Sequence, residues 1–539
     1  MNVVLSIPEQ NGGYSSDGFT IIYKQPILKH FLDELYSYQE RVDNIVIITK
    51  YKDIFDKYAS IFIKDELFLR KVYTIAATTD DMFENLKLAD RLFESIGTES
   101  DYTLLWSTSE LVFNSGRLSD ISLGAFRCFH NDRPVDIYRF DSSIMKNVIA
   151  TDPIDFPDFL HRYEHADQTE VLIEFGDYFP VKTDYLSKFK IEHYLISHDC
   201  NEDFRFEVDP INQTLKKSVR YSLRLDNYSP EKAAYVKKLR KELFNEQDFL
   251  SACNANQRIF VPELIEVGTT KAGDYVDDIT YEYITPVTLE SHLLFGDMSK
   301  DNVEVCIEKL MTAVHNVFHN TEATPYDIAV SSISERNVSS YLRAKKESYI
   351  KVLDDYFKEY CPENIERNEI TFTANDYNSW RSYIDAVFTE YEKICSADSI
   401  IQNGRCGRLV HGALTFDNII YNSYDNTMKF INPKYPKHKI VNKHDDLVAL
   451  LMSTFMNLHA ILNGYYYECD HYIRIPQVLE DKTALYLEVI EDLGENIPLF
   501  KLLSVLEFLK YSHENSISEE QRRAMIKYAT QIKNILFCG

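Results

Sequence analysis

The sequence predicts an α/β domain at the N-terminus, then a small, mainly antiparallel sheet with one helix, and finally a helical C-terminal part. Three observations predict this order. Short apolar runs alternate with segments of helical periodicity up to about residue 200. From about residue 203, several short strand patterns surround one long charged helix. Beyond residue 297, apolar residues recur mostly at helical spacing.

Residues 1–202 are expected to form one domain with a doubly wound, parallel sheet, because strands and helices alternate along the chain. The apolar positions 27, 28, 31, 32 and 35 lie on one helical face, and they illustrate the helical signal. The predicted strands cover 3–7, 45–49, 72–76 and 102–106, and the predicted helices cover 27–35, 51–58 and 80–96.

Residues 203–296 are expected to form an α+β part, and residues 297–539 a helical part. A helix that begins near Asp297 has capping residues at its start, and its apolar side chains share one face. The predicted strands cover 204–208, 215–219, 221–225, 261–267 and 279–284, and the main predicted helices cover 230–253, 297–318, 334–357 and runs within 481–537.

Composition narrows the class of protein. The chain has 539 residues, of which 45% are hydrophobic and 26% charged, as in ordinary globular proteins. Its 58 Lys and Arg against 84 Asp and Glu leave a net charge of −26, which argues against a general nucleic-acid binder. The nine cysteines form no C-x-x-C pair, and we find no signal peptide and no apolar run of membrane-spanning length. We therefore expect a cytoplasmic protein without a membrane span.

The most specific motif lies at residues 409–421, which read L-V-H-G-A-L-T-F-D-N-I-I-Y, followed by M-K-F-I-N-P at 428–433 and H-D-D-L at 444–447. This pattern resembles the catalytic core of the aminoglycoside-phosphotransferase and choline-kinase branch of the protein-kinase-like fold. That branch carries H-G-D-L-x-x-x-N, then a strand that ends in Asp, then an Asp-Leu pair. In such a core the loop Asp accepts the proton of the substrate hydroxyl, while the Asn and the strand-end Asp hold Mg²⁺.

The match is incomplete at the two positions that carry the chemistry. His411, Asn418 and Asp446 agree with the family pattern, but Ala413 stands in place of the catalytic Asp and Asn432 in place of the metal-binding Asp. Alanine cannot accept a proton, and an Asn side chain offers a metal ion an oxygen without a charge. The resemblance therefore implies a weakened site for ATP and Mg²⁺, with Asn418 and Asn432 as its remaining metal ligands.

The same resemblance extends to the residues before the motif. Lys217, or its neighbour Lys216, would pair with Glu246 on the following helix and reach the phosphates of the nucleotide. Glu282 and Ile284 lie at the end of a predicted strand, where the resemblance places the hinge that binds adenine.

The N-terminal domain resembles sugar-phosphate nucleotidyltransferases in its first strand, its Gly12-Gly13 loop and the segment 24–30. The loop lacks the Arg of that family, the P-K-P-L segment is missing, and 106–110 contains no metal-binding Asp. An ordinary turn at Gly12-Gly13 is a simpler interpretation than a phosphate-binding loop, which is the alternative. This half also lacks the expected catalytic groups.

Together the two halves resemble bacterial proteins that join a nucleotidyltransferase-like domain to a choline-kinase-like domain, typically in capsule or other surface-polysaccharide synthesis. The first hypothesis is a pseudoenzyme that binds a nucleotide, a glycan precursor or a partner enzyme. One alternative is an active but atypical phosphotransferase that uses ATP on a small sugar or amino-alcohol. It would use the retained Asn418, Asp446 and Lys217, with Asp417 or groups of the substrate replacing the missing carboxylates. Another alternative is a structural subunit of an assembly.

Overall fold

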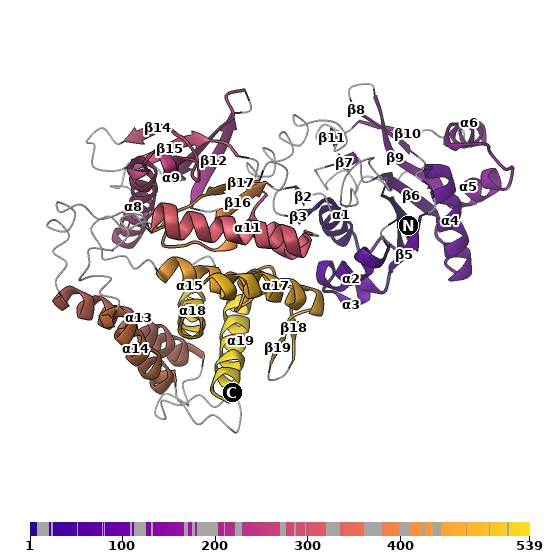
Figure 1. Ribbon diagram of the computed structural model, residues 1–539. Coiled ribbons are helices and arrows are strands. Elements are labelled where there is room, and N and C mark those ends of the chain that lie inside the picture. The colour runs from indigo at the N-terminus through magenta and orange to yellow at the C-terminus, as the bar shows by residue number, and fades with distance from the viewer. Residues whose placement is uncertain are drawn as a thin grey trace. The chain divides into compact units, whose positions relative to one another are not determined.

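The chain consists of two compact units, Met1–His198 and Asp199–Gly539, in a computed structural model. Each unit is described by itself below, with its elements labelled as in Figure 1. The structure describes residues 1–7, 21–22, 25–50, 52–77, 79, 81–107, 110–112, 126–130, 133–166, 171–174, 178–180, 203–209, 211–220, 229–269, 276–284, 287–296, 298–319, 335–360, 380–397, 410–422, 426–434, 444–469, 472–494, 496–514 and 517–538.

The first unit is built on a seven-stranded sheet with the order β10-β8-β9-β6-β1-β4-β5. Strands β1 and β4 are buried at every position, which explains why they read as continuous apolar runs. The strands are β1 (Asn2–Ser6), β4 (Asn44–Thr49), β5 (Val72–Ala76), β6 (Tyr102–Ser107), β8 (Phe126–His130), β9 (Arg133–Asp141) and β10 (Val171–Glu174), and two small pairs join β2 (Ile21–Ile22) to β3 (Gln25–Pro26) and β7 (Glu110–Val112) to β11 (Tyr178–Pro180).

The sheet is mixed, so the predicted all-parallel sheet is wrong at one side. Strands β5, β4, β1 and β6 pair in parallel, as expected. Strand β9, however, runs antiparallel to both β6 and β8. Because only two residues separate β8 from β9, the chain must turn back as a hairpin, and a parallel pair would need a much longer connection.

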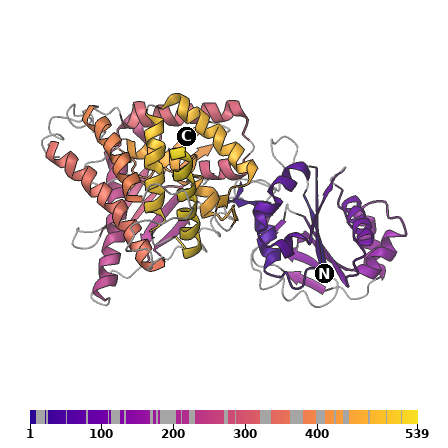
Figure 2. The ribbon, with the colours of Figure 1, turned by 90° about the horizontal axis from the view of Figure 1, so that it is seen from below.

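Helices cover both faces of this sheet (Figure 2). On one face, apolar side chains of α4, α5 and α6 pack against the strands, and Phe83 stacks on Phe159 with ring centroids 5.4 Å apart. On the other face, Phe31 of α1 meets Trp106 of β6 edge-on at 4.5 Å. The helices of this unit are α1 (Ile27–Tyr36), α2 (Lys52–Phe62), α3 (Glu66–Leu69), α4 (Met82–Ser95), α5 (Ser142–Ile149) and α6 (Phe156–Ala166).

The second unit begins with a four-stranded antiparallel sheet in the order β12-β13-β15-β14. Helix α8 packs against it, with Leu243 among the buried residues that also include Ile279 of β15. The elements are β12 (Phe204–Asp209), β13 (Thr214–Val219), α8 (Pro230–Ala252), α9 (Ala255–Arg258), β14 (Leu264–Thr269) and β15 (Val276–Glu282). The predicted strand at 221–225 lies outside the described residues.

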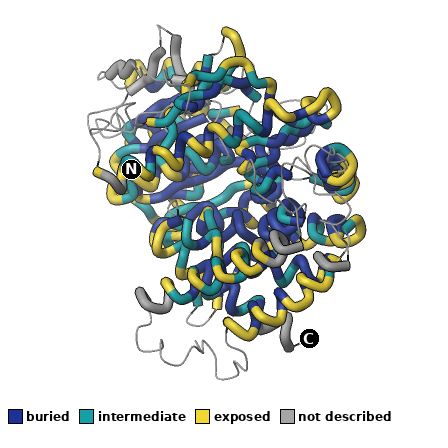
Figure 3. The backbone as a smooth tube through the Cα atoms, turned by 90° about the vertical axis from the view of Figure 1, so that its left-hand side faces the viewer, coloured by how far each residue is buried: buried dark blue, intermediate teal, exposed yellow. Residues whose placement is uncertain are grey.

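The rest of this unit is mostly helical, as predicted. The predicted apolar face from Val303 to Phe318 is buried, and its helix begins after the cap Ser299. Figure 3 shows buried residues along the strands and the inner helices. The elements are α10 (Leu289–Phe295), α11 (Lys300–Thr312), the π-helix η4 (Ala313–Phe318), α13 (Glu335–Tyr360), α14 (Trp380–Ala397), the 3₁₀ turn η6 (Phe416–Asn418), β16 (Ile419–Asn422), β17 (Thr427–Phe430), α15 (His444–Ser453), α16 (Leu458–Leu462), β18 (Tyr467–Glu468), β19 (Ile473–Arg474), α17 (Gln477–Leu493), α18 (Ile497–Tyr511) and α19 (Glu519–Cys538).

None of the helices within the described ranges is both long and apolar enough to cross a membrane. The cytoplasmic location stays a prediction.

Candidate functional site

A buried ion pair joins the sheet of the second unit to helix α8. Lys217 Nζ on β13 lies 2.9 Å from Glu246 Oε2, and these side chains are only 10% and 6% exposed. Alternation along the strand turns Lys216 to the opposite face, where it pairs with Asp278 at 3.3 Å and stays 43% exposed. Of the two candidate lysines, Lys217 therefore faces the interior, and the structure brings it to Glu246.

The same lysine begins a chain of hydrogen bonds that crosses three segments of the unit. Lys217 Nζ donates to Asn432 Oδ1 at 3.1 Å, and Asn432 Nδ2 donates to Asn418 Oδ1 at 3.2 Å. Asn418 Nδ2 then donates to the carbonyl oxygen of Ala413 at 2.8 Å and to Thr415 Oγ1 at 3.2 Å. We call this chain, from Lys217 through Asn432 and Asn418 to Ala413, the amide relay.

The donors and acceptors of the amide relay can be arranged in only one direction. An ammonium group has no acceptor, so the oxygen of Asn432 must face Lys217 and its NH₂ group must face Asn418. At the far end, the carbonyl of Ala413 has no donor, so the NH₂ group of Asn418 must face it. Both amide orientations follow from the two ends, and each side-chain amide oxygen already accepts a hydrogen bond.

The loop that carries Ala413 is held from beneath by a buried carboxylate. Asp446 is 1% exposed, and it accepts the backbone N–H of Gly412 at 2.8 Å and of His411 at 3.1 Å. His319 donates to the same carboxylate at 3.0 Å. Gly412 has a φ of +78°, and a Cβ there would lie 3.1 Å from the carbonyl oxygen of Lys434. The loop therefore needs glycine at this position.

No hydrogen bond or ion pair among the described residues joins the side chain of His411 to the amide relay. Its Nε2 donates to the backbone oxygen of Ile431 at 2.9 Å, and its ring packs edge-on against Phe249 and Phe430. Burial lowers the pKa of His411, although the nearby Asp446 opposes that shift. A neutral imidazole that bonds to Ile431 ties the loop to the segment that carries Asn432.

The two remaining loop positions differ in what they offer. Ala413 contributes a methyl group and its carbonyl, so it supplies no ionisable group. Asp417 lies in the turn η6, and its buried Oδ1 has no hydrogen-bond partner among the residues that the structure describes. Asp417 carries the one carboxylate in the sequence of residues 411–418.

The two predicted hinge residues are not joined to the amide relay by any hydrogen bond or ion pair of the described residues. Glu282, at the end of β15, lies 3.4 Å from Lys429 Nζ on β17 and 3.3 Å from the backbone nitrogen of Glu263, which donates to it. Ile284 follows the strand and is half-buried. The Glu282 side chain thus links β15 to β17.

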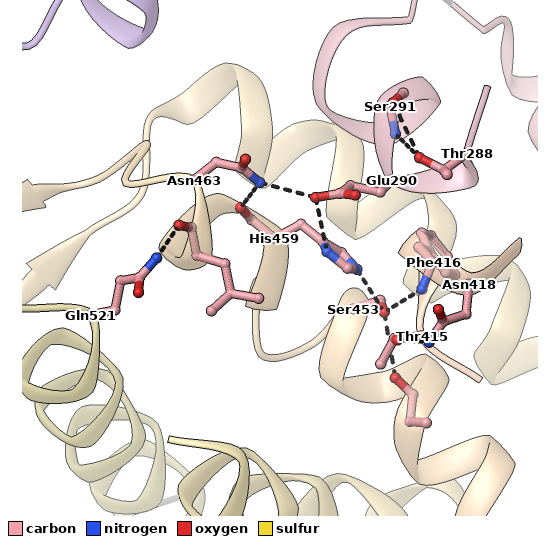
Figure 4. Close-up of polar contacts among 12 residues, drawn as sticks. Thr288, Glu290, Ser291, Thr415, Phe416, Asn418, Ser453, His459, Asn463 and Gln521 are labelled. Carbon is pink, nitrogen blue, oxygen red and sulfur yellow. Dashed lines mark hydrogen bonds and ion pairs between the residues drawn. The ribbon is translucent and has the colours of Figure 1, made fainter. Parts of the chain in front are cut away.

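A second polar network, buried except at Asn463 and not indicated by the sequence, supports the turn η6 (Figure 4). Ser453 Oγ accepts the backbone N–H of Phe416 at 3.0 Å and lies 3.0 Å from His459 Nε2. His459 Nδ1 lies 3.4 Å from Glu290 Oε1, and Asn463 Nδ2 donates to the same oxygen at 3.0 Å. Helices α10, α15 and α16 supply these groups, so no local sequence pattern could reveal their meeting.

The donor set at the amide relay does not suit Mg²⁺, which prefers carboxylate and water oxygens in octahedral geometry. The relay offers two neutral amide oxygens, and each of them already accepts one hydrogen bond. Across the described ranges, no cluster of three or more His, Cys, Asp or Glu side chains could hold a metal ion.

The candidate site of the first unit is less completely described. The Gly12-Gly13 loop lies outside the described residues, and so do residues 108 and 109 after β6. At the carboxyl end of β1, Ser6 Oγ accepts a hydrogen bond from Asn85 Nδ2 at 3.0 Å, and both residues are buried. This polar contact links β1 to α4.

Comparisons with known proteins give no relative by sequence: no family model matches, and no curated protein matches. Among solved structures, a 4-diphosphocytidyl-2C-methyl-D-erythritol synthase matches with 13% identity and a TM-score of 0.27, over 35% of this chain and 96% of that one. A UTP-bound UGPase from Acinetobacter baumannii matches with 12% identity and a TM-score of 0.28, over 37% of this chain and 94% of that one. Both matches lie in the N-terminal region.

Proposed function

We propose that the second unit is a kinase-like unit that binds a nucleotide and does not transfer its phosphoryl group. One observation carries the proposal. The buried pair of Lys217 and Glu246 is complete, whereas the amide relay and the methyl group of Ala413 occupy the places where the resemblance expects two carboxylates.

The loss of transfer follows from the missing proton acceptor. Phosphoryl transfer to a hydroxyl needs a group that orients the nucleophile and accepts its proton, and such groups contribute about 10²–10⁴-fold in rate. Ala413 can do neither. Asp446 has both oxygens engaged by the loop backbone and His319, so it cannot replace the missing group.

The buried ion pair of Lys217 supports the proposal that nucleotide binding is retained. Glu246 is buried and holds the ammonium group of Lys217 at the edge of the amide relay, beside the exposed Asn432. A buried ion pair is seldom a gain in stability by itself, so its presence favours a role in orienting Lys217 toward a ligand. An anionic phosphate is the ligand that an oriented ammonium group suits best.

The first unit enters the proposal through resemblance. Likeness to two-domain proteins of surface-polysaccharide synthesis favours a sugar nucleotide or glycan precursor as its ligand, and a partner enzyme as an alternative.

Thermal unfolding of the full chain with ATP, CTP and UTP tests the proposal. A nucleotide at about 100 times its dissociation constant should add about 2.7 kcal/mol of apparent stability. We expect Lys217→Met to abolish this gain and Lys216→Met, on the opposite face of β13, to keep it. No gain with any nucleotide would refute binding and favour the structural-subunit hypothesis.

An atypical active phosphotransferase is the second candidate. It is favoured by the Oδ1 atom of Asp417, which has no hydrogen-bond partner in the part of the chain that the structure describes. In that case Asp417 would accept the proton in place of the missing loop carboxylate. Transfer of the γ-phosphate to a sugar or amino-alcohol, lost in Asp417→Asn, would establish it and overturn the first proposal.

A further inference from the structure

We propose that the second unit binds its nucleotide without a divalent cation, because the amide relay takes the place of one. This inference rests on the proposed function, and it adds the form of the ligand: a metal-free nucleotide.

The donor atoms argue against a bound cation. Asn418 Oδ1 accepts from Asn432, and Asn432 Oδ1 accepts from Lys217. Each oxygen keeps one further lone pair, but a cation bound there would lie close to the N–H donor that the oxygen already accepts, and for Asn432 Oδ1 that donor is the ammonium group of Lys217. The two polar ends of the relay leave no alternative orientation of the amides. The relay would give such a cation two neutral ligands and no carboxylate, which does not compensate for the loss of its bound water.

The connections explain what the relay does in place of a cation. A phosphate-bound metal ion commonly links the loop, the strand that follows it and the nucleotide. Here hydrogen bonds alone link β13, the second residue after β17 and the loop at Ala413. His411 adds a second tie between the loop and the backbone at Ile431. The geometry of the site is thus complete without an ion.

The charge at the site predicts which nucleotides bind best. The amide relay contains one cation, Lys217, and Glu246 already neutralises it at 2.9 Å. The protein as a whole carries −26. Each further phosphate on the ligand adds negative charge with no cation in the relay to meet it. We therefore expect affinity not to rise from a nucleoside monophosphate to the triphosphate.

Calorimetric titration of the full chain with AMP, ADP and ATP, each in excess EDTA or excess MgCl₂, tests the inference. We expect dissociation constants in the two buffers to agree within about threefold, which is less than 1 kcal/mol. Binding that appears only with MgCl₂ would overturn the inference and leave the proposed function standing. Absence of binding in both buffers would overturn the proposed function as well.

Two variants test whether the relay is the cause. Asn432→Asp places a carboxylate beside Lys217, and Asn418→Asp places one at the next residue of the amide relay. We expect either change to make binding of ATP tighter in MgCl₂ than in EDTA by about tenfold or more. Asn422→Asp, the same change at the exposed end of β16, should keep the ratio near one. Variants at 432 and 418 that both stay indifferent to MgCl₂ would refute the role of the relay.

Discussion

At the scale of single residues, the pair of Lys217 and Glu246 is the strongest electrostatic feature of the candidate site. The side chains are 10% and 6% exposed, so little water reaches either charge. Removal of one partner leaves the other charge buried and unpaired, which is far more damaging than loss of a surface pair. Lys216 and Asp278, on the other face of the same strand, provide that surface pair for comparison.

We expect Lys217→Met to lower the free energy of unfolding by about 3 kcal/mol, because it strands the carboxylate of Glu246. The double variant Lys217→Met/Glu246→Gln should recover a large part of that loss, since it removes both charges. Lys216→Met should lower the free energy by about 1 kcal/mol or less. Urea unfolding of the four proteins measures the three differences. Equal effects of the two lysine variants would contradict the buried pair.

Glu34 on α1 offers a pH-dependent test in the first unit. Burial raises the pKa of Glu34 from 4.5 to about 7, and its Oε1 has no hydrogen-bond partner within the described residues. The folded chain therefore holds a proton that the unfolded chain releases, so Glu34 reduces stability as the pH rises from 4.5 to 7, and the loss is complete above that range.

We expect Glu34→Gln to raise the Tm by about 2–4 °C near pH 8 and to change it far less near pH 4, below the ordinary pKa of 4.5. Glu66→Gln, on the short helix α3 with a side chain that is 86% exposed, is the control and should change the Tm at neither pH. Thermal unfolding at both pH values provides the measurement. A Glu34→Gln gain that is larger at the lower pH would contradict the raised pKa.

At the scale of elements, periodicity in the sequence locates most strands and helices because burial on one face repeats along the chain. The apolar positions of α1 are an example, and all five predicted positions are buried. The direction of β9 could not be read in this way, because alternation is the same for parallel and antiparallel strands. The two-residue connection between β8 and β9 decides the direction of β9, and neither of these strands is among those that the sequence predicts.

The candidate site likewise has features that the sequence indicated and features that only the tertiary structure shows. The motif at 411–418 could be recognised from sequence because its residues are local and specific, and the pair of Lys217, or Lys216, with Glu246 is what the resemblance carried by that motif implies. The contact between Asn432 and Lys217 joins positions 215 residues apart. The support of η6 by Ser453 and His459 likewise depends on how helices pack, which no local pattern encodes.

The side chain of Ser453 links helix α15 to the turn η6, which carries Asn418. Ser453→Ala leaves the buried N–H of Phe416 without its acceptor, and we expect a loss of about 1–3 kcal/mol in the free energy of unfolding. Weaker nucleotide binding should accompany it, because the turn positions the amide relay.

Ser504→Ala is the matched control, since Ser504 is equally buried and its hydroxyl donates within its own helix to Lys501 O. Its effect should stay below about 1 kcal/mol, with nucleotide affinity unchanged. Urea unfolding and titration of both variants provide the comparison. Equal losses of affinity would show that η6 does not depend on Ser453.

At the scale of the whole molecule, each of the two units has a hydrophobic core of its own among the described residues. One lies between the seven-stranded sheet and helices α4, α5 and α6, and another lies between the four-stranded sheet and α8. The units divide at His198 and Asp199, so they comprise 198 and 539 − 198 = 341 residues. Units of these sizes bury enough apolar surface to unfold as separate cooperative bodies.

We therefore expect calorimetry of the full chain to resolve two unfolding transitions that respond to different changes. Near pH 8, Glu34→Gln should raise the transition of the first unit alone, while Lys217→Met should lower that of the second unit alone. A nucleotide bound at the amide relay should raise only the transition that Lys217→Met lowers, because a ligand stabilises the body that holds it. A single transition that both variants move would mean that the two units unfold as one cooperative body.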